Sequence, residues 1–483
     1  MSNSAKGSAS KRIDMLLDDN SFVEVGSHIT ARSTNFNMAA QEAKADGVIT
    51  GYGTIDGNLV YVYSQDSAVL GGSIGEMHAR KISGLYKMAM KMGAPVVGLL
   101  DCSGLRLQEG IDSLDGFGQL YLSQTMASGV IPQIVGVFGN CGGGLAVSSA
   151  IADFVYMEAN SKLFVNSPNA LAGSDGVKGD TATAKYQSET SGLADGVGSE
   201  EEVLENIRTL VSILPSNNED DMSYDECQDD LNRISPDLAG WTGDTARALA
   251  EISDNRFFME TKADYARSMV TGFIRLNGST VGCVANRTEI YNAENEKTEE
   301  MEAELTAAAC EKAAEFVNFC DAFSIPLLTL VNVKGYKKCE CTEKKIARAA
   351  GRLTYAFANA DVAKVTVVIG DAFGSAYLTM NSKSIGADMV YAWPQAKIGM
   401  MDAQSAVKIM YAEEINASEK AAALISEKAA EYEKLQSSAE AAAMRGYVDD
   451  IIEAGETRKR VIAAFEMLFT KREERPAKKH GTV

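Results

Sequence analysis

Histidine is scarce in this chain, whose 483 residues contain only His28, His78 and His480. Mechanisms that need several imidazole groups, such as a histidine-rich metal centre or a Ser-His-Asp relay, therefore lack the side chains to build them. The eight cysteines are also few and irregularly spaced, and only Cys339 and Cys341 lie close together. We interpret the cysteines as reduced thiols, mostly buried, and expect no metal site.

Positive charge and long apolar runs are also lacking. The chain has 46 Lys and Arg against 66 Asp and Glu, a formal net charge of −20, whereas a generic nucleic-acid-binding protein presents excess positive charge. The apolar runs, such as 94–100, are far shorter than the ~18 residues of a membrane span, and the first twelve residues lack the apolar core typical of a signal peptide. With 46% apolar residues, the sequence predicts a cytoplasmic globular protein of two large domains or three smaller ones.

What the sequence does contain is an internal repeat. Four segments recur in the same order: 48–60 resembles 269–281, 94–100 resembles 325–331, 134–144 resembles 365–375, and 152–156 resembles 387–391. In the first pair, Asp-Gly or Asn-Gly joins two alternating apolar runs, which is typical of a β-hairpin. Helical patterns such as 75–92 and 303–323 lie between the predicted strands. Each copy therefore predicts an α/β architecture with functional loops at strand ends.

An acidic stretch at 215–230 separates the two copies. We expect it to be a solvated linker between an N-terminal domain, 1–225, and a C-terminal domain, 226–483. Near the end of the chain, 418–436 is rich in Ala, Glu and Lys with apolar residues at helical spacing. This pattern predicts a long helix that packs on its neighbours or on a second subunit.

Two repeat-equivalent glycine loops are the strongest candidate site. Residues 140–146 have the sequence NCGGGLA and 371–377 have DAFGSAY, and each loop joins a predicted strand to a predicted helix. Small residues at such a junction leave the backbone N–H groups of the helix N-terminus accessible to an anion or oxyanion. Glycine can also serve close helix packing alone, but recurrence at equivalent positions favours the oxyanion site.

Two other motifs have simpler structural explanations. Residues 71–75, GGSIG, match the G-x-S-x-G turn of serine hydrolases, but only His78 and His480 follow them. A structural or substrate-positioning loop is therefore favoured over a hydrolase. Residues 89–92, AMKM, resemble the motif whose lysine accepts biotin, yet their surroundings have helical spacing. We expect Lys91 to lie on a helix and to carry no biotin.

Nine further segments carry a family resemblance that extends over nearly the whole chain. They are 46–57, 64–66, 70–78, 108–114, 127–133, 386–388, 391–394, 445–450 and 478–481. In this order they resemble the carboxyltransferase subunits of biotin-dependent acyl-CoA carboxylases and sodium-pumping acyl-CoA decarboxylases. The resemblance implies two tandem crotonase-like (ClpP/crotonase superfamily) domains of the ββα superhelix type, the first for the acyl-CoA and the second for biotin.

The resemblance also implies a reaction, the transfer of CO2 between biotin on a partner protein and the α-carbon of a short acyl-CoA. Backbone N–H groups of Gly143 and Gly144 would bind the enolate oxygen of the thioester, and those of Gly374, Ser375 and Ala376 the ureido oxygen of biotin. Biotin itself would remove the α-proton, which agrees with the scarcity of histidine. The expected cofactor-binding residues are Gly71, Gly72, Gly142, Tyr377 and Leu378.

The partners implied by the resemblance are a biotin carboxyl carrier protein and either a biotin carboxylase or a membrane decarboxylase subunit. The chain itself would form a homodimer or a trimer of dimers, with one subunit's first half against another's second half. It would not enter a membrane. Arg32, Arg80 and Lys81 are candidates for contacts with the CoA phosphates.

Some positions depart from the family pattern. Leu378 stands where propionyl-type members have Asp, and 334–345 replaces a Pro-Gly-Phe segment on the biotin side. Leu378 therefore leaves the acyl-CoA unassigned, and the altered segment 334–345 makes a degenerate, non-catalytic scaffold subunit an alternative. A crotonase-type hydratase or isomerase is less favoured, because neither glycine loop is followed by a repeat-equivalent Glu.

Overall fold

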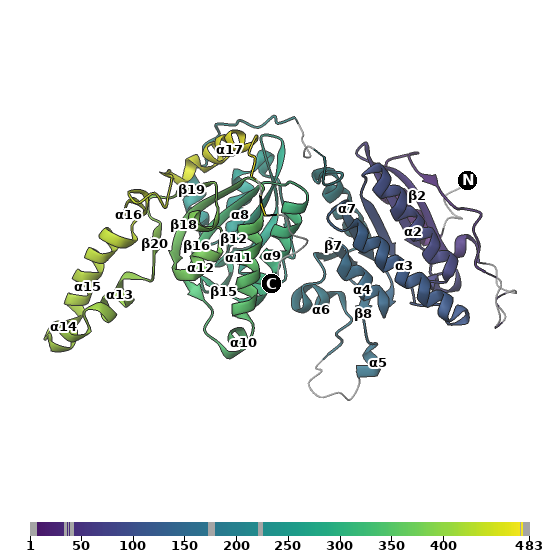
Figure 1. Ribbon diagram of the computed structural model, residues 1–483, viewed down its shortest axis with the longest axis horizontal. Helices are drawn as coiled ribbons and strands as arrows, with labels where there is room; N and C mark the ends of the chain where they lie inside the picture. Colours follow the sequence, from purple (N-terminus) through teal and green to yellow (C-terminus); the bar gives the residue numbers. More distant parts are fainter. Residues whose placement is uncertain are drawn as a thin grey trace. The chain divides into compact units, whose positions relative to one another are not determined.

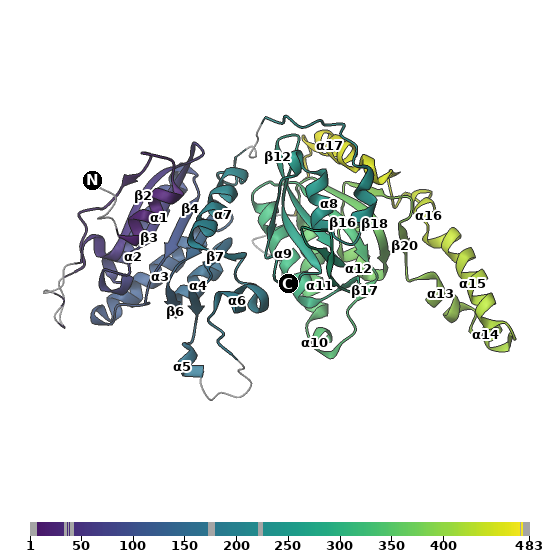
Figure 2. The same cartoon turned by 180° about the vertical axis from the view of Figure 1, so that it is seen from behind.

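The computed structural model describes residues 7–32, 36, 38, 43–171, 179–220, 226–473 and 475–476. The chain divides into two compact units, Met1–Ser223 and Tyr224–Val483. Each unit has its own core of buried apolar side chains, and in each a twisted sheet is covered by helices (Figures 1 and 2). Within the described residues, no helix is both long enough and apolar enough to cross a membrane.

The first unit is built on a seven-stranded sheet in the order β1-β2-β3-β4-β5-β7-β9. The hairpin strands are antiparallel and the strands from β3 onward are parallel. The strands are β1 (Val23–Glu24), β2 (Val48–Ile55), β3 (Asn58–Gln65), β4 (Val96–Leu100), β5 (Gln133–Val137), β7 (Phe154–Glu158) and β9 (Gly196–Gly198), with β6 (Asn140–Gly142) and β8 (Lys162–Phe164) forming a separate pair. The helices are α1 (Ser8–Leu16), α2 (Glu76–Met92), α3 (Ile111–Ala127), α4 (Gly144–Ile151), α5 (Pro168–Leu171), α6 (Ala184–Tyr186) and α7 (Glu200–Ile213).

The second unit repeats this sheet in the order β10-β11-β12-β16-β18-β19-β21, with β20 paired to β18. Its strands are β10 (Phe258–Thr261), β11 (Met269–Leu276), β12 (Ser279–Asn286), β16 (Leu327–Val333), β18 (Lys364–Phe373), β19 (Met389–Ala392), β20 (Lys397–Gly399) and β21 (Asp450–Ile451), with the pairs β13 (Glu289–Tyr291) and β14 (Lys297–Glu300), and β15 (Glu304–Leu305) and β17 (Gly335–Tyr336). The helices are α8 (Thr245–Ile252), α9 (Ala307–Ala322), α10 (Glu340–Glu343), α11 (Ile346–Asn359), α12 (Gly374–Thr379), α13 (Ala403–Met410), α14 (Ala412–Ala417), α15 (Ala421–Tyr432), α16 (Ala439–Ala443) and α17 (Thr457–Leu468).

All four sequence repeats occupy equivalent strands of the two sheets. The predicted hairpins are β2–β3 and β11–β12, and both turn residues of each have positive φ, at Asp56-Gly57 and Asn277-Gly278. This is the conformation in which Asp-Gly and Asn-Gly match the strand twist. The remaining repeats are β4 and β16, β5 with β6 and β18, and β7 and β19.

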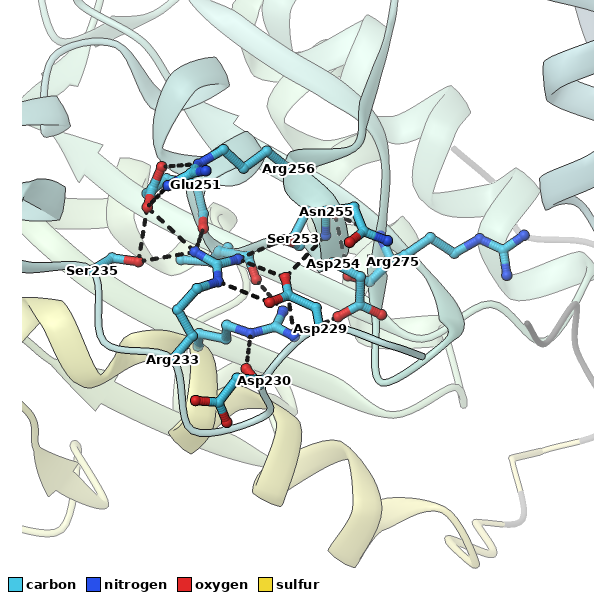
Figure 3. Close-up of polar contacts among 12 residues, drawn as sticks. Asp229, Asp230, Arg233, Ser235, Glu251, Ser253, Asp254, Asn255, Arg256 and Arg275 are labelled. Atoms are coloured by element: carbon cyan, nitrogen blue, oxygen red, sulfur yellow. Dashed lines mark hydrogen bonds and ion pairs between the residues drawn. The ribbon is translucent and has the colours of Figure 1, made fainter. Parts of the chain in front are cut away.

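The units also share a polar device that fixes each hairpin turn. In the first unit the carboxylate of Asp18 accepts the N–H groups of Asp56 and Gly57 at 3.0 Å each. In the second, Asp254 accepts those of Asn277 at 3.2 Å and Gly278 at 2.7 Å. Figure 3 shows Asp254 within a larger polar cluster of the second unit, whose other labelled members include Asp229, Arg233, Ser235, Glu251 and Arg256.

The predicted helices are present, with boundaries set by local capping. Lys91 lies on α2, as predicted. The pattern at 303–323 begins as strand β15, and α9 starts only after Thr306, whose side chain accepts the N–H of Ala309 at 3.1 Å. The pattern at 418–436 forms α15 and then a π-helical turn, Glu433–Ser437. Together with α13 and α14 it extends away from the sheet of its unit (Figure 1).

Candidate active site

Three glycine-containing loops of the first unit meet where β3, β4 and β5 end. A Cβ added at Gly72 would lie 2.3 Å from the carbonyl oxygen of Asp101, and one at Gly71 would lie 2.9 Å from Ser103 Oγ. A Cβ at Gly104 would lie 3.7 Å from the carbonyl oxygen of Gly142. Glycine at positions 71 and 72 therefore lets the loop after β3 approach the loop after β4 this closely.

The loop at 140–146 contains a tight entry into α4. Gly142 ends β6 and pairs with Phe164. Gly143 is the N-cap of α4 with φ +66°, and its N–H donates to the carbonyl oxygen of Phe164 at 2.8 Å. That N–H is therefore occupied within the protein, which corrects its predicted use as a donor to the substrate. Gly144 opens the helix, where N–H groups have no intrahelical acceptor.

The backbone N–H of Leu105, which the sequence interpretation missed as a possible donor, lies beside this loop. The N–H of Ile74 donates to Gly104 O at 2.9 Å, and Ile74 O accepts the N–H of Arg106 at 3.0 Å. In such a parallel bridge, the N–H of the intervening residue, Leu105, points to the opposite side. The sequence could have pointed to Leu105 only through the internal repeat, because Leu105 follows the repeat glycine Gly104 as Tyr336 follows Gly335.

The loop of the second unit also has a glycine with positive φ at the start of its helix. Gly374 opens α12 with φ +62°, close to the φ of Gly143, and an added Cβ would lie 3.2 Å from Met400 O. Ser375 is exposed and Ala376 is buried. Tyr377 is buried, which raises the pKa of its phenol to about 12, and Leu378 is 43% exposed. The first turn of α12 thus presents backbone N–H groups with little side-chain cover.

The altered segment 334–345 is packed against this loop. Within it, β17 pairs with β15, and Leu305 O accepts the N–H of Lys337 at 2.9 Å. The hydroxyl of Tyr336 lies 3.0 Å from Thr379 Oγ1 at the end of α12. A tyrosine therefore joins the segment to the helix that carries the glycine loop.

A buried ion cluster supports the loops of the first unit. The guanidinium of Arg106 lies 2.6 Å from Asp46 and 2.7 Å from Glu109, and each of these side chains is at most 1% exposed. Burial raises the pKa of Asp46, and Arg106 opposes that shift. Arg106 also donates to Ser73 O at 2.7 Å and to Ser73 Oγ at 3.2 Å. Ser73 is thus part of the scaffold, as expected for a structural loop.

His78 belongs to the same buried network. Its Nδ1 lies 2.8 Å from Asp46 O, and its Nε2 lies 3.1 Å from Gln65 Nε2. Burial lowers the pKa of the imidazole to about 3. The side chain is therefore neutral at physiological pH and has both ring nitrogens engaged, which suits a structural role.

The predicted CoA-contacting side chains are only partly accessible. Lys81 is buried and donates to Ala45 O at 2.9 Å and to Val48 O. Its selection as a CoA ligand was therefore wrong, because the ammonium group is committed to backbone carbonyls. Arg32 and Arg80 are exposed and both pair with Glu76.

Two α/β units, each with a glycine loop that enters a helix at the carboxyl edge of its sheet, define a tandem crotonase-like protein. The chain belongs to the carboxyl transferase domain family, which it matches over residues 3–483. It is an acyl-CoA carboxyltransferase subunit, of the carboxylase, decarboxylase and transcarboxylase family. The predicted fold and enzyme class are confirmed.

Its relatives include subunits of both decarboxylases and carboxylases. The chain is 39% identical to the methylmalonyl-CoA decarboxylase subunit alpha of Propionigenium modestum, covering 99% of this chain and 93% of the relative. It is 40% identical to the propionyl-CoA carboxylase carboxyltransferase subunit of Haloferax mediterranei, with the same coverage. The solved structure of transcarboxylase 12S, a hexamer with hydrolysed methylmalonyl-coenzyme A bound, is 37% identical, with a TM-score of 0.91 over 98% of this chain and 92% of that one.

Proposed function

We propose that this chain transfers a carboxyl group between biotin on a separate carrier protein and the α-carbon of a short acyl-CoA. The observation that carries the proposal is the pair of repeat-equivalent loops, in which Gly143 and Gly374 have nearly the same positive φ, 66° and 62°, at the start of a helix. Each loop can therefore present backbone N–H groups to a developing oxyanion. Such donors contribute about 10²–10³ each to the rate.

In the first unit, the N–H groups of Gly144 and Leu105 would stabilise the enolate oxygen of the thioester. Gly143 supplies the turn rather than a donor, because its N–H is bound to Phe164 O. Gly71, Gly72 and Gly142 would contact the CoA through their backbone, and their lack of side chains lets the loops that carry them pack closely against neighbouring residues. No side-chain base is assigned, because His78 is buried and neutral.

In the second unit, the N–H groups of Ser375, Ala376 and Tyr336 would hold the ureido oxygen of biotin. The residues fit such a group, since Gly374 has no side chain at the turn and Ser375 is exposed. Biotin, when bound, supplies the nitrogen that carries CO2 and accepts the α-proton. Tyr377 and Leu378 would contact the ring of the bound biotin or the acyl chain beside it. From this position they would influence which acyl chain is accepted.

The proposed partners follow from the assignment of the acyl-CoA to the first unit and of biotin to the second. A biotin carboxyl carrier protein would deliver the biotin, and a biotin carboxylase or a membrane decarboxylase subunit would drive the cycle. We propose a dimer, or three such dimers, in which one subunit's first half meets another's second half. The hexamer of the 37% identical transcarboxylase 12S supports an assembly of this size.

A decarboxylation assay with free biotin tests the proposal. The purified full chain is incubated with malonyl-, methylmalonyl- or glutaconyl-CoA, and biotin-dependent loss of the carboxyl group is followed. We expect turnover of at least one of them. A folded oligomer that turns over none would favour a non-catalytic scaffold, and hydration of crotonyl-CoA without biotin would favour a hydratase.

A matched pair of variants at Ser375 tests the role of the backbone. Proline is tolerated in the first turn of a helix but has no N–H, so Ser375→Pro removes one proposed donor. We expect kcat to fall about 10²–10³-fold. Ser375→Ala keeps the N–H and should retain nearly full activity. Equal losses in both variants would instead assign the effect to the side chain.

A further inference from the structure

The eight cysteines separate into six ordinary thiols and one unusual pair. Burial raises the pKa of the thiols at positions 102, 141, 227, 283, 310 and 320. The remaining two lie one residue apart in the altered segment, with Cys339 half-buried and Cys341 exposed. No step of the proposed reaction uses them.

The surroundings of Cys339 stabilise a thiolate. Its Sγ accepts the N–H of Thr342 at 3.4 Å and lies 3.1 Å from Thr342 Oγ1. A hydrogen bond from Cys341, these contacts with Thr342 and the charge of Lys337 lower the pKa of Cys339 to about 7. The thiol therefore ionises more readily than an ordinary cysteine, and the thiolate is the form that attacks disulfides. The other charged side chains of the segment are Lys334, Lys338, Glu340, Glu343, Lys344 and Lys345.

The spacing of the pair allows a disulfide bond. Two residues separated by one other span at most about 7 Å between Cα atoms, which is the upper limit for a disulfide. Cys339 is half-buried and Cys341 is exposed, and both lie at the start of the short helix α10, so the bond requires no unfolding of the unit. A disulfide in so short a ring is strained, and strained, exposed disulfides are readily reduced again.

We propose that Cys339 and Cys341 are a redox-active dithiol that low-molecular-weight disulfides convert reversibly into an intramolecular disulfide. The Cys339 thiolate attacks one sulfur of the small disulfide, whose S–S bond breaks and releases a thiolate. That thiolate takes the proton of the Cys341 thiol. The Cys341 sulfur then attacks Cys339 Sγ in the mixed disulfide, and the second small thiolate leaves and is protonated by water. Two thiols of the chain are oxidised, and one small disulfide is reduced to two thiols.

The position of the pair connects it to the loop of the second unit. Figure 2 shows α10 on a loop beyond β17 and α11. Tyr336 precedes the pair, and its hydroxyl contacts Thr379 of α12, which also lies 3.1 Å from Thr354 of α11. A disulfide would draw Cys339 Sγ from the N–H of Thr342 and open the first turn of α10. We therefore expect oxidation to disturb Tyr336, a consequence that rests on the proposed function.

Mass spectrometry of the full chain tests the dithiol directly. The protein is equilibrated in buffers of increasing oxidised-to-reduced glutathione ratio, quenched with acid, alkylated and digested. We expect a peptide bridged between Cys339 and Cys341 that dithiothreitol reverts. Cys341→Ser should instead stop at one glutathione on Cys339, whereas the matched control Cys227→Ser should behave as the wild type. Two free thiols in every buffer, or no glutathione on Cys341→Ser, would overturn the proposal.

Activity provides a separate readout. The bridged protein should lose biotin-dependent decarboxylation severalfold and regain it with dithiothreitol, while Cys339→Ser should be insensitive to the buffer. Unchanged activity of fully bridged protein would contradict the connection to the loop. Because the bridge is detected by mass, a reduced enzyme without turnover would refute the proposed function and leave the test of the dithiol intact.

Discussion

At the scale of single residues, Arg106 connects two of the loops of the first unit through buried contacts. It holds two carboxylates, Asp46 and Glu109, that are almost completely buried. Removing one partner of a buried ion pair leaves uncompensated charge and costs about 3–5 kcal/mol. We expect Arg106→Met to lower the free energy of unfolding by about that amount in urea titrations. Arg80→Met, at an exposed pair with Glu76, should change it by less than about 1 kcal/mol, and equal effects would contradict this explanation.

His78 gives the first unit a defined sensitivity to acid. Burial lowers the pKa of the folded imidazole from 6.5 to about 3. Between these values the unfolded chain binds a proton that the folded chain does not, so stability is lost as pH falls from 6.5 toward 3. The slope contributed is up to about 1.4 kcal/mol per pH unit.

Urea unfolding at about pH 7 and about pH 5 measures this contribution. The variant His78→Gln cannot take up the proton, and all other titrating groups are common to both proteins. We therefore expect the variant to lose less stability between the two pH values than the wild type. Parallel losses in the two proteins would show that the imidazole is not the sensitive group.

At the scale of elements, the same arginine–aspartate device occurs in both units with different burial. Arg458 is fully buried, lies 2.6 Å from Asp254 and donates to Ile252 O at 2.7 Å. Its counterpart Arg208 is 21% exposed, lies 3.0 Å from Asp18 and donates to Leu16 O at 2.6 Å. Each arginine thus links a backbone carbonyl oxygen to the carboxylate that accepts the N–H groups of a hairpin turn.

Burial predicts unequal effects of removing these arginines. Arg458→Met leaves Asp254 without its buried cation, so we expect a loss of about 3–5 kcal/mol. Arg208→Met leaves Asp18 near water, and we expect a loss of about 1 kcal/mol or less. Hydrogen exchange read by mass spectrometry should place the loss of protection around β11–β12 and β2–β3 respectively. A larger effect from Arg208→Met would contradict the assignment by burial.

The elements of this fold were more predictable than the contacts within them. The Asp-Gly and Asn-Gly turns and the apolar runs specify local structure, so both hairpins and the strand repeats followed from sequence. The availability of the Gly143 N–H did not, because its acceptor, Phe164, comes from a distant strand. Lys81 looked like a surface charge for the same reason, since its carbonyl partners at Ala45 and Val48 are fixed only by tertiary packing. Leu105 carries no chemical signal at all, because a backbone N–H is common to nearly every residue type.

At the scale of the whole molecule, net charge sets how an acyl-CoA approaches. CoA is a polyanion and the chain carries −20, so long-range electrostatics oppose association, and we expect binding to rest on local donors such as the proposed backbone N–H groups. Raising ionic strength from about 0.01 M to about 0.15 M shortens the Debye length from about 30 Å to about 8 Å and screens the repulsion. We therefore expect the association rate constant of malonyl-CoA, measured by stopped flow, to stay level or rise with salt. The corresponding pantetheine thioester lacks the nucleotide phosphates and keeps only the charge of its malonyl carboxylate, so it should show a smaller change. A steep fall for malonyl-CoA alone would mean that a local cluster of basic side chains, and not the net charge, governs the approach.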